Sequence, residues 1–331
     1  ELMSLSGLPA ETLDHHHVPL YLNTGLLSEM SHFGIKEAEG IGLYRTEFPF
    51  MVRDRFPGED TQYTNYRKVL ETFAPRPVVL RTLDIGGDKP LPYFPVSESN
   101  PFLGWRGVRI SLDHPEIFLT QVRAMLRANS GLGNLHIMMP MVSSVNEVEE
   151  LTTLIRRAYR ELVSEGYAIT MPKTGVMIEV PAAVYKSAAI AKRVDFISVG
   201  TNDLTQYLLA VDRNNPRVAA IYSDLHPALL QALQQTVQGA RQYNCPVGVC
   251  GEMAGNPLAT PLLLGLGVDS LSMSTGSLLR VKRTIRSLEK AQAENWLENA
   301  LQMDDAADVS SYMHAVLEQK GLEMLIKPGK R

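Results

Sequence analysis

Short apolar segments alternate along this chain with longer segments whose apolar positions recur with the period of a helix. The short segments have the length and β-branched content of buried strands, and they are residues 18–23, 41–44, 78–83, 136–140, 175–178, 196–199, 247–250 and 270–273. The longer segments predict helices that end near residue 33 and then cover 62–73, 116–128, 145–164, 182–192, 228–243 and 258–266. Strands that alternate with helices return to one sheet by right-handed crossovers and are parallel. Eight such units predict the α/β class and a closed (β/α)₈ TIM barrel.

Two segments fall outside the predicted barrel, which covers residues 18–288. Residues 1–17 lack an initiator methionine and are interpreted as a linker from a missing N-terminal part. Residues 289–331 contain two amphipathic helical patterns, 291–303 and 308–320. Their apolar stripe must pack on the barrel or on a second subunit, so these C-terminal helices extend the barrel or form a dimer interface.

Composition excludes several classes of protein. The 331 residues are 45% hydrophobic and 21% charged with a net charge of −4, which leaves no basic surface for nucleic acid. No apolar run approaches the roughly 20 residues that cross a bilayer, so no membrane association is expected. The only cysteines, Cys245 and Cys250, are too few for a disulfide framework and favour a reducing, cytoplasmic location.

Polar residues stand where the predicted strands end, which is where TIM barrels carry their catalytic groups. A buried charge without a partner is very costly, so these groups need each other, a metal ion or a charged ligand. The set suits a small, strongly anionic ligand held together with a divalent cation. The residues are Arg45, Thr46, Glu47, Arg81, Asp84, Glu179, Asn202, Asp203, Cys250 and Glu252.

The carboxylates Glu179 and Asp203 follow neighbouring strands, so their oxygens are expected to converge. Two carboxylates with room for water and ligand oxygens are a usual arrangement for Mg²⁺. Two alternatives remain at this point: salt bridges with nearby arginines, and a simple capping role for Asn202 or Asp203 at the next helix. No cysteine or histidine spacing typical of zinc occurs.

Five arginines lie beside glycines or turn residues rather than on predicted helix faces: Arg45, Arg81, Arg106, Arg109 and Arg213. The guanidinium fork suits phosphate and carboxylate oxygens. A single arginine in such a position is more often part of a structural ion pair, and Arg109 begins an amphipathic segment where such a pair is common. Convergence of several at one end of the barrel would require an anion.

Cys250 lies between Val249 and Gly251 and is expected to point into the mouth of the barrel. A lone buried cysteine is commonly an inert small hydrophobe, and Cys245 fits that interpretation. A proton-transfer role for Cys250 depends on whether the other residues support enolate chemistry.

Five sequence blocks in this order resemble the phosphoenolpyruvate (PEP)-utilising enzymes. They are GIGLYRTEF (40–48), RTLDIGGDK (81–89), NPFLGWR (100–106), GTNDLTQY (200–207) with AVDR (210–213), and VCGEMAG (249–255). From about residue 18 to 286 the chain resembles the C-terminal PEP-binding barrel of enzyme I, the PEP–protein phosphotransferase. The residues around Tyr44 and Trp105 look more like enzyme I than pyruvate phosphate dikinase. Residues 178–181 and 21–26 resemble the nitrogen-related paralogue.

The resemblance implies a role for each candidate residue. Arg45, Arg81 and Arg213 would bind PEP, mainly its phosphate, with Arg106 alongside. Glu179 and Asp203 would hold Mg²⁺, with Asn202 and Asp203 beside the substrate. Cys250 would protonate the enolate as pyruvate forms.

In this family the phosphoryl group passes to a histidine on a swivelling domain and then to a phosphocarrier protein. The Gly-Gly-x-x-(Ser/Thr)-His motif of that domain is absent here, and the histidines at 15–17 are interpreted as part of a solvated linker. The resemblance therefore implies a PEP-binding half that forms a homodimer but cannot itself accept the phosphoryl group. Three alternatives are a PEP-sensing barrel without turnover, a dikinase or PEP synthase fragment, and a lyase of malyl or citryl thioesters.

Overall fold

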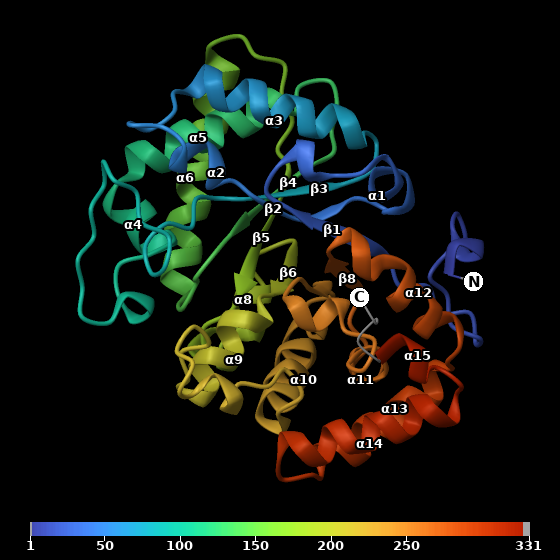
Figure 1. Ribbon diagram of the computed structural model, residues 1–331. Coiled ribbons are helices and arrows are strands. Elements are labelled where there is room, and N and C mark those ends of the chain that lie inside the picture. The colour runs from blue at the N-terminus through green and yellow to red at the C-terminus, as the bar shows by residue number, and fades with distance from the viewer. Residues whose placement is uncertain (1, 327–331) are drawn as a thin grey trace.

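Eight parallel strands form a closed barrel in the computed structural model, which describes residues 2–326 (Figure 1). Neighbours along the chain pair in order, and the first strand closes the barrel against the last, with Tyr21 opposite Ser272. The predicted (β/α)₈ barrel is confirmed. The strands are β1 (Leu20–Thr24), β2 (Ile41–Arg45), β3 (Val78–Arg81), β4 (Leu135–Met139), β5 (Lys173–Ile178), β6 (Phe196–Val199), β7 (Val247–Val249) and β8 (Ser270–Met273).

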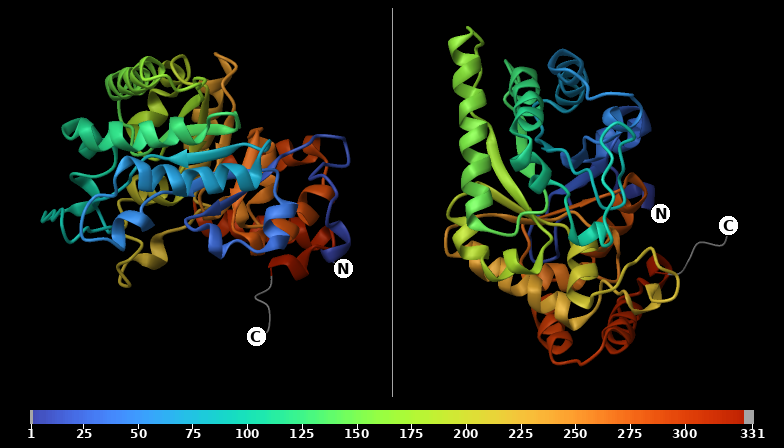
Figure 2. Two further views of the ribbon diagram at one scale, coloured as in Figure 1. Left: turned by 90° about the horizontal axis from the view of Figure 1, so that it is seen from above. Right: turned by 90° about the vertical axis from the view of Figure 1, so that its left-hand side faces the viewer.

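Helices surround the barrel because each connection between strands carries one (Figures 1 and 2). The long helices α3, α5 and α6 pack side by side, and α10 packs on α8. The helices of the barrel are α1 (His32–Glu37), α2 (Phe48–Met51), α3 (Glu59–Phe73), α4 (Val108–Asp113), α5 (Pro115–Ala128), α6 (Val145–Ser164), α7 (Pro181–Tyr185), α8 (Ser187–Ala191), α9 (Thr201–Leu209), α10 (Pro227–Arg241), α11 (Thr260–Leu266) and α12 (Leu278–Arg286).

Two predicted helices differ from those observed. The helix over 182–192 is divided into α7 and α8, because Lys186 between them leaves helical geometry with φ −106° and ψ 16°. The helix expected to end near residue 33 is a short turn, η2 (Leu27–Glu29), followed by α1. Helix α1 begins after Ser31, whose hydroxyl accepts a hydrogen bond from the Gly34 amide at 3.0 Å.

Helix α9 (Thr201–Leu209) begins directly after β6, where the sequence analysis expects a helix without giving its bounds. Gly200 occupies the position before its first turn, so Asn202 and Asp203 lie inside that turn. The alternative in which one of them serves as the N-cap of this helix is therefore wrong. Helix α9 thus carries both side chains, and it begins where β6 ends.

Five buried apolar side chains pack together inside the barrel. They form the interior cluster: Leu43, Val79, Met138, Met177 and Cys250. A larger apolar core fills the space between the strands and the surrounding helices. The interior cluster divides the barrel into a mouth at the carboxyl ends of the strands and a floor at their amino ends.

The C-terminal helices α13 (Lys290–Leu301), α14 (Ala306–Gln319) and α15 (Glu323–Ile326) extend the fold beyond the barrel. Helix α13 lies against α11, where a Cβ added to Gly265 would come within 2.5 Å of the Ala293 carbonyl oxygen. Ala293, Leu297 and Ala300 are buried. The apolar stripe of α13 thus packs on a helix of the same barrel.

Residues 2–17 are fixed to the barrel near α12. The turn η1 (Leu2–Leu5) packs on α12, and Arg286 donates a hydrogen bond to the Pro9 carbonyl oxygen at 2.8 Å. The Glu37 carboxylate accepts hydrogen bonds from Ser6 and Gly7 and pairs with Lys282.

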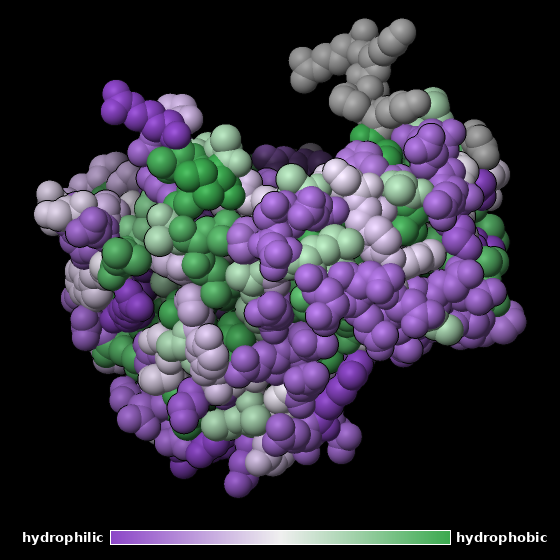
Figure 3. All heavy atoms as spheres, turned by 90° about the horizontal axis from the view of Figure 1, so that it is seen from below, coloured by the Kyte–Doolittle hydropathy of each residue, from purple (hydrophilic) through white to green (hydrophobic). Residues whose placement is uncertain are grey.

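The surface agrees with the composition. Hydrophilic side chains cover much of the face in Figure 3, and apolar residues form patches between them. Within residues 2–326, no helix combines the length and the apolar character needed to cross a membrane.

Candidate active site

The residues singled out from the sequence gather at the mouth of the barrel. Arg45 and Arg81 end β2 and β3, while Glu179 and Cys250 immediately follow β5 and β7. Asn202 and Asp203 stand on the first turn of α9, and the loops after β3 and α9 supply Arg106 and Arg213. Parallel strands direct their carboxyl ends to one side of the barrel, so residues up to 205 positions apart in the chain meet there.

Glu179 and Asp203 form a buried carboxyl pair joined by a hydrogen bond. Burial and the negative charges of Asp203 and Asp84 raise the pKa of Glu179 well above its usual value. Burial would also raise the pKa of Asp203, but Arg106, the hydrogen bond from Glu179 and Arg213 together lower it. Within the pair, the proton is therefore favoured on Glu179 rather than on Asp203, and Glu179 Oε1 also accepts a hydrogen bond from the Met141 amide at 2.8 Å.

This carboxyl pair fits a divalent cation that is shared with a ligand. Two carboxylates so close that they must share a proton are a site where a cation replaces that proton. Among residues 2–326 there is no group of three or more histidine, cysteine or acidic side chains arranged to hold a metal. A magnesium ion at Glu179 and Asp203 would therefore complete its six oxygen ligands with water or with oxygens of the substrate.

Arg106 lies at the centre of the ion pairs of the mouth. Its Nη2 is 3.1 Å from Asp84 Oδ2 and 3.3 Å from Asp203 Oδ2, and its Nη1 donates to the Tyr207 hydroxyl at 3.3 Å. The second buried arginine, Arg81, pairs with Glu47 at 3.0 Å. Within the described residues, the buried Nε groups of Arg81 and Arg106 have no hydrogen-bond partner. The buried guanidinium groups thus keep donor capacity that their carboxylate partners do not use.

The outer arginines are more accessible. Arg213 is partly exposed and pairs with Asp203 Oδ1 at 3.0 Å. Arg45 is exposed, and the structure gives it no hydrogen bond or ion pair with any residue from 2 to 326. Together with Arg81, Arg106 and Lys89, they bring five cations to the mouth, and Arg45 has no carboxylate partner among the described residues. Such a concentration of cations favours an anion.

Cys250 lies at the base of the mouth as a member of the interior cluster. Its side chain is buried, and its Sγ donates to the Val199 carbonyl oxygen at 3.6 Å. Burial raises the pKa of the thiol to about 11, so Cys250 holds its proton at neutral pH. It can act as an acid there, but it is not a thiolate nucleophile.

Asn202 presents its amide nitrogen at the mouth. Its side-chain oxygen accepts a hydrogen bond from the Glu252 amide at 2.9 Å, and its main-chain oxygen accepts one from Tyr222 at 3.2 Å. Glu252 itself is exposed and contributes only its backbone. The fifth arginine of the sequence analysis, Arg109, lies outside the site and donates to the carbonyl oxygens of Leu103 and Gly104.

Three residues of the site were given no role by the sequence. Glu47 Oε1 accepts hydrogen bonds from Arg81 and, at 2.9 Å, from the Asp84 amide, so it fixes the start of the loop after β3. Asp84 joins Arg81, Arg106 and Lys89. Tyr207 donates to the Phe102 carbonyl oxygen, and its spacing of four residues from Asp203 on α9 is the signal that could have revealed it.

Comparison with known proteins identifies the family. The family model described as "PEP-utilising enzyme, PEP-binding domain" matches residues 1–290. The "Phosphoenolpyruvate-dependent phosphotransferase system" protein of Escherichia coli (strain K12) is 50% identical over 324 residues, which are 98% of this chain and 43% of that protein. The phosphoenolpyruvate-protein phosphotransferase of Haemophilus influenzae is 44% identical over 97% of this chain and 56% of its own. That of Bacillus subtilis is 43% identical over 95% and 55%.

The chain thus spans about half the length of the curated relatives that it matches. The match to the family model covers most of the barrel strands and loops that carry the mouth. Sequence and architecture together show that the chain belongs to the PEP-utilising enzyme family and corresponds to its PEP-binding domain.

Proposed function

We propose that the mouth of this barrel binds PEP together with Mg²⁺ and takes part in the transfer of its phosphoryl group. The observation that carries the proposal is the buried Glu179–Asp203 carboxyl pair beside a cluster of arginines. The site thus contains a carboxyl pair that suits a cation and a cluster of guanidinium groups that suits an anion. A small phosphorylated acid bound with a divalent cation satisfies both at once.

Each arginine has a distinct position toward the phosphate and carboxylate of PEP. Arg81 and Arg106 are held by Glu47, Asp84 and Asp203 and offer a fixed array of donors. Arg45 and Arg213, nearer the solvent, contact the phosphate as it enters, and Asn202 donates from its amide nitrogen. Bound at Glu179 and Asp203, Mg²⁺ would neutralise charge on the phosphate and on the enolate oxygen.

The proposed reaction breaks the bond between phosphorus and the enol oxygen of PEP, and the phosphoryl group forms a bond with a histidine nitrogen. The remaining enolate of pyruvate takes the proton of the Cys250 thiol at its methylene carbon, and pyruvate leaves. The raised pKa of Cys250 keeps that proton available at neutral pH. Solvent then returns a proton to the thiolate before the next turnover.

The accepting histidine belongs, in this proposal, to another domain of a longer protein. Relatives named phosphoenolpyruvate-protein phosphotransferase are about twice as long as the segment they share with this chain. We propose that such a protein passes the phosphoryl group to a phosphocarrier in the cytoplasm. We further propose a homodimer and, from the motifs at 21–26 and 178–181, the nitrogen-related branch of the system.

Calorimetric titration with PEP in the presence and absence of Mg²⁺ tests the proposed site. We expect Mg²⁺ to tighten PEP binding at least about tenfold, which corresponds to about 1.4 kcal/mol. Glu179→Gln should remove this dependence, because one ligand of the cation is lost. Glu318→Gln, on the exposed face of α14, is the matched control and should behave as the parent chain. Equal PEP affinity with and without Mg²⁺ would contradict the roles of Glu179 and Asp203.

A further inference from the structure

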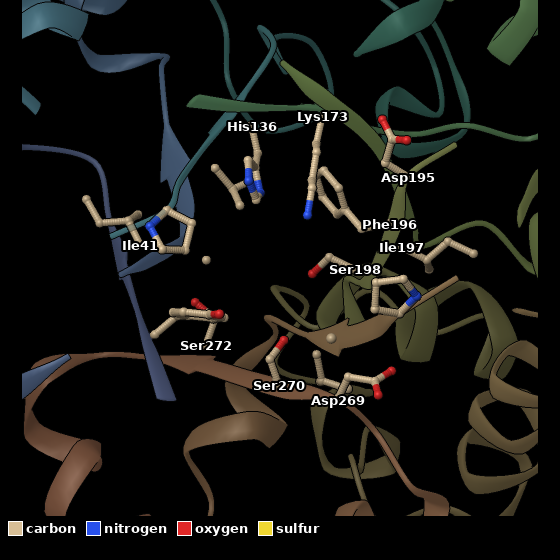
Figure 4. Close-up of a pocket in the computed structure, with 17 residues that line it drawn as sticks. Ile41, His136, Lys173, Asp195, Phe196, Ile197, Ser198, Asp269, Ser270 and Ser272 are labelled. Carbon is tan, nitrogen blue, oxygen red and sulfur yellow. The ribbon is translucent and has the colours of Figure 1, made fainter. Parts of the chain in front are cut away.

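The floor of the barrel, at the end opposite the mouth, contains a cavity of about 230 Å³. Figure 4 shows the side chains of Lys173, His136, Ser198 and Ser270 directed into this space. They come from β4, β5, β6 and β8, so the cavity lies inside the ring of strands. The mechanism proposed for the mouth uses none of them.

Small residues in the strands keep this cavity open. On two strands the floor residue lies two positions before a member of the interior cluster, so Gly248 stands below Cys250 and His136 below Met138, while Val79 lies level with His136. TIM barrels usually fill such a layer with bulky branched side chains. Here the lining includes five small residues, Gly42, Gly248, Ser198, Ser270 and Ser272, and a Cβ added to Gly248 would come within 2.5 Å of Ser270 Oγ. The floor is therefore hollow because of residues that the sequence specifies.

The polar groups that face the cavity are mainly unused donors. Within the described part of the chain, the structure gives no hydrogen bond or ion pair to the side chains of Lys173, His136 or Ser270. The carboxylates at the rim are already engaged, since Asp195 and Asp269 accept hydrogen bonds from backbone amides at 2.8 and 2.7 Å. Figure 4 shows both directed away from the centre. The groups that face the centre of the cavity are thus the Lys173 ammonium group and the Ser270 hydroxyl group.

One wall of the cavity is formed by two aromatic rings. The rings of His136 and Phe196 lie with centroids 5.6 Å apart, and Val79 of the interior cluster closes the top. Burial and the charge of Lys173 lower the pKa of His136 to about 4, so its ring is neutral at pH 7. Lys173 is therefore the positive charge that a ligand in this cavity would meet.

We propose that the barrel floor is a second ligand site, which binds a small monocarboxylate with a flat apolar body. Its carboxylate pairs with the Lys173 ammonium group and accepts a hydrogen bond from Ser270, while its body lies on Phe196. The cavity is smaller than most sites for drug-sized molecules, which restricts the ligand to a small acid. The interior cluster separates this site from the mouth, so it is distinct from the PEP site.

Benzoate and its neutral isostere benzamide, titrated by ligand-observed NMR, test this proposal in the presence of saturating PEP and Mg²⁺, which occupy the mouth. We expect benzoate to bind and benzamide to bind at least about tenfold more weakly, because only benzoate carries a charge for Lys173. Lys173→Met should weaken benzoate binding about tenfold. Lys68→Met, on the outer face of α3, should leave it unchanged. Ser270→Leu should abolish binding by filling the cavity, with PEP affinity retained.

Several results would overturn the proposal. They are equal affinity for benzoate and benzamide, equal binding by Lys173→Met and Lys68→Met, and loss of benzoate binding when PEP is added. Absence of benzoate binding to the parent chain would also overturn it. Circular dichroism of each variant establishes that it is folded before its affinity is compared.

Discussion

Cys250 retains its proton at neutral pH because it lies among Leu43, Val79, Met138 and Met177 rather than among the arginines above it. Burial keeps the Cys250 thiol protonated, which would make a cysteine without a reaction partner inert. Next to an enolate, the same protonated thiol can act as an acid. The arginines behave differently, because each buried guanidinium group is paired with a carboxylate that fixes its direction. Individual side chains of the mouth thus owe their chemistry to their immediate neighbours.

Cys250→Ala should separate binding from proton transfer. PEP affinity should stay within about twofold, because the thiol contacts neither the phosphate nor the cation in the proposed complex. Pyruvate formation by a full-length protein that carries the accepting histidine should fall at least about 100-fold. The matched control is Cys245→Ala, whose cysteine is buried away from the mouth. Unchanged pyruvate formation would return Cys250 to a purely structural role.

His136 makes the stability of the fold depend on pH. Burial and the charge of Lys173 lower its pKa from 6.5 to about 4, so between these values the unfolded chain binds the proton and the folded chain does not. The contribution of His136 to the free energy of unfolding is fully present above pH 6.5. As the pH falls towards 4, about 2 kcal/mol of this contribution is lost.

Urea unfolding of the parent chain and of His136→Asn between pH 7 and 4 measures this contribution. The parent should lose about 2 kcal/mol more than the variant over that range. His15→Asn, at an exposed position, is the control and should follow the parent. Identical pH profiles for the parent and His136→Asn would contradict the assignment.

At the scale of elements, the apolar strands were predictable because each short buried segment is bounded by polar or turn residues. The observed strands begin and end within a few residues of the predicted ones. The start of helix α9 was placed too late because Thr201, Asn202 and Asp203 are polar and weak helix formers, and tertiary packing overrides that preference. The pairing of Arg106 with Asp84 and Asp203 joins residues 22 and 97 positions apart, a relation that local patterns do not contain.

The contact between α11 and α13 depends on the absence of a side chain at Gly265. In Gly265→Ala, the added Cβ would meet the Ala293 carbonyl oxygen at 2.5 Å and Leu297 Cβ at 2.9 Å, so α13 must move. We expect a net loss of at least about 1 kcal/mol in the free energy of unfolding, despite the higher helix propensity of alanine. Gly276→Ala, with no atom within 4 Å of the added Cβ, is the matched control in the same urea titration. Equal stability of both variants would show that α13 adjusts without cost.

For the whole molecule, the proposed reaction divides two roles: the barrel binds PEP, and another domain accepts the phosphoryl group. Its sequence has no Gly-Gly-x-x-(Ser/Thr)-His motif, and the chain spans about half the length of the relatives it matches. The fold could therefore be predicted from the sequence, but the phosphoryl acceptor could not be placed, because it lies on another domain in the proposed reaction.

Incubation of the 331-residue chain with PEP labelled on its phosphate should yield no stable phosphohistidine. The eight histidines of the chain include none in the acceptor motif. Addition of a domain that carries the accepting histidine should restore both the label on that domain and pyruvate release, measured by gel autoradiography and a coupled assay. Stable label on the isolated chain would contradict the division of roles.

The position of the interior cluster has a stereochemical consequence. Cys250 belongs to this cluster, so in the proposed complex it approaches PEP from below, while solvent reaches the mouth from above. The proposed reaction therefore protonates the enolate carbon on one face only. PEP that carries one deuterium at its methylene carbon in a single, Z or E, geometry, turned over by the full-length enzyme in tritiated water, should give pyruvate with a chiral methyl group of a single configuration. A racemic methyl group would show that solvent, and not Cys250, delivers the proton.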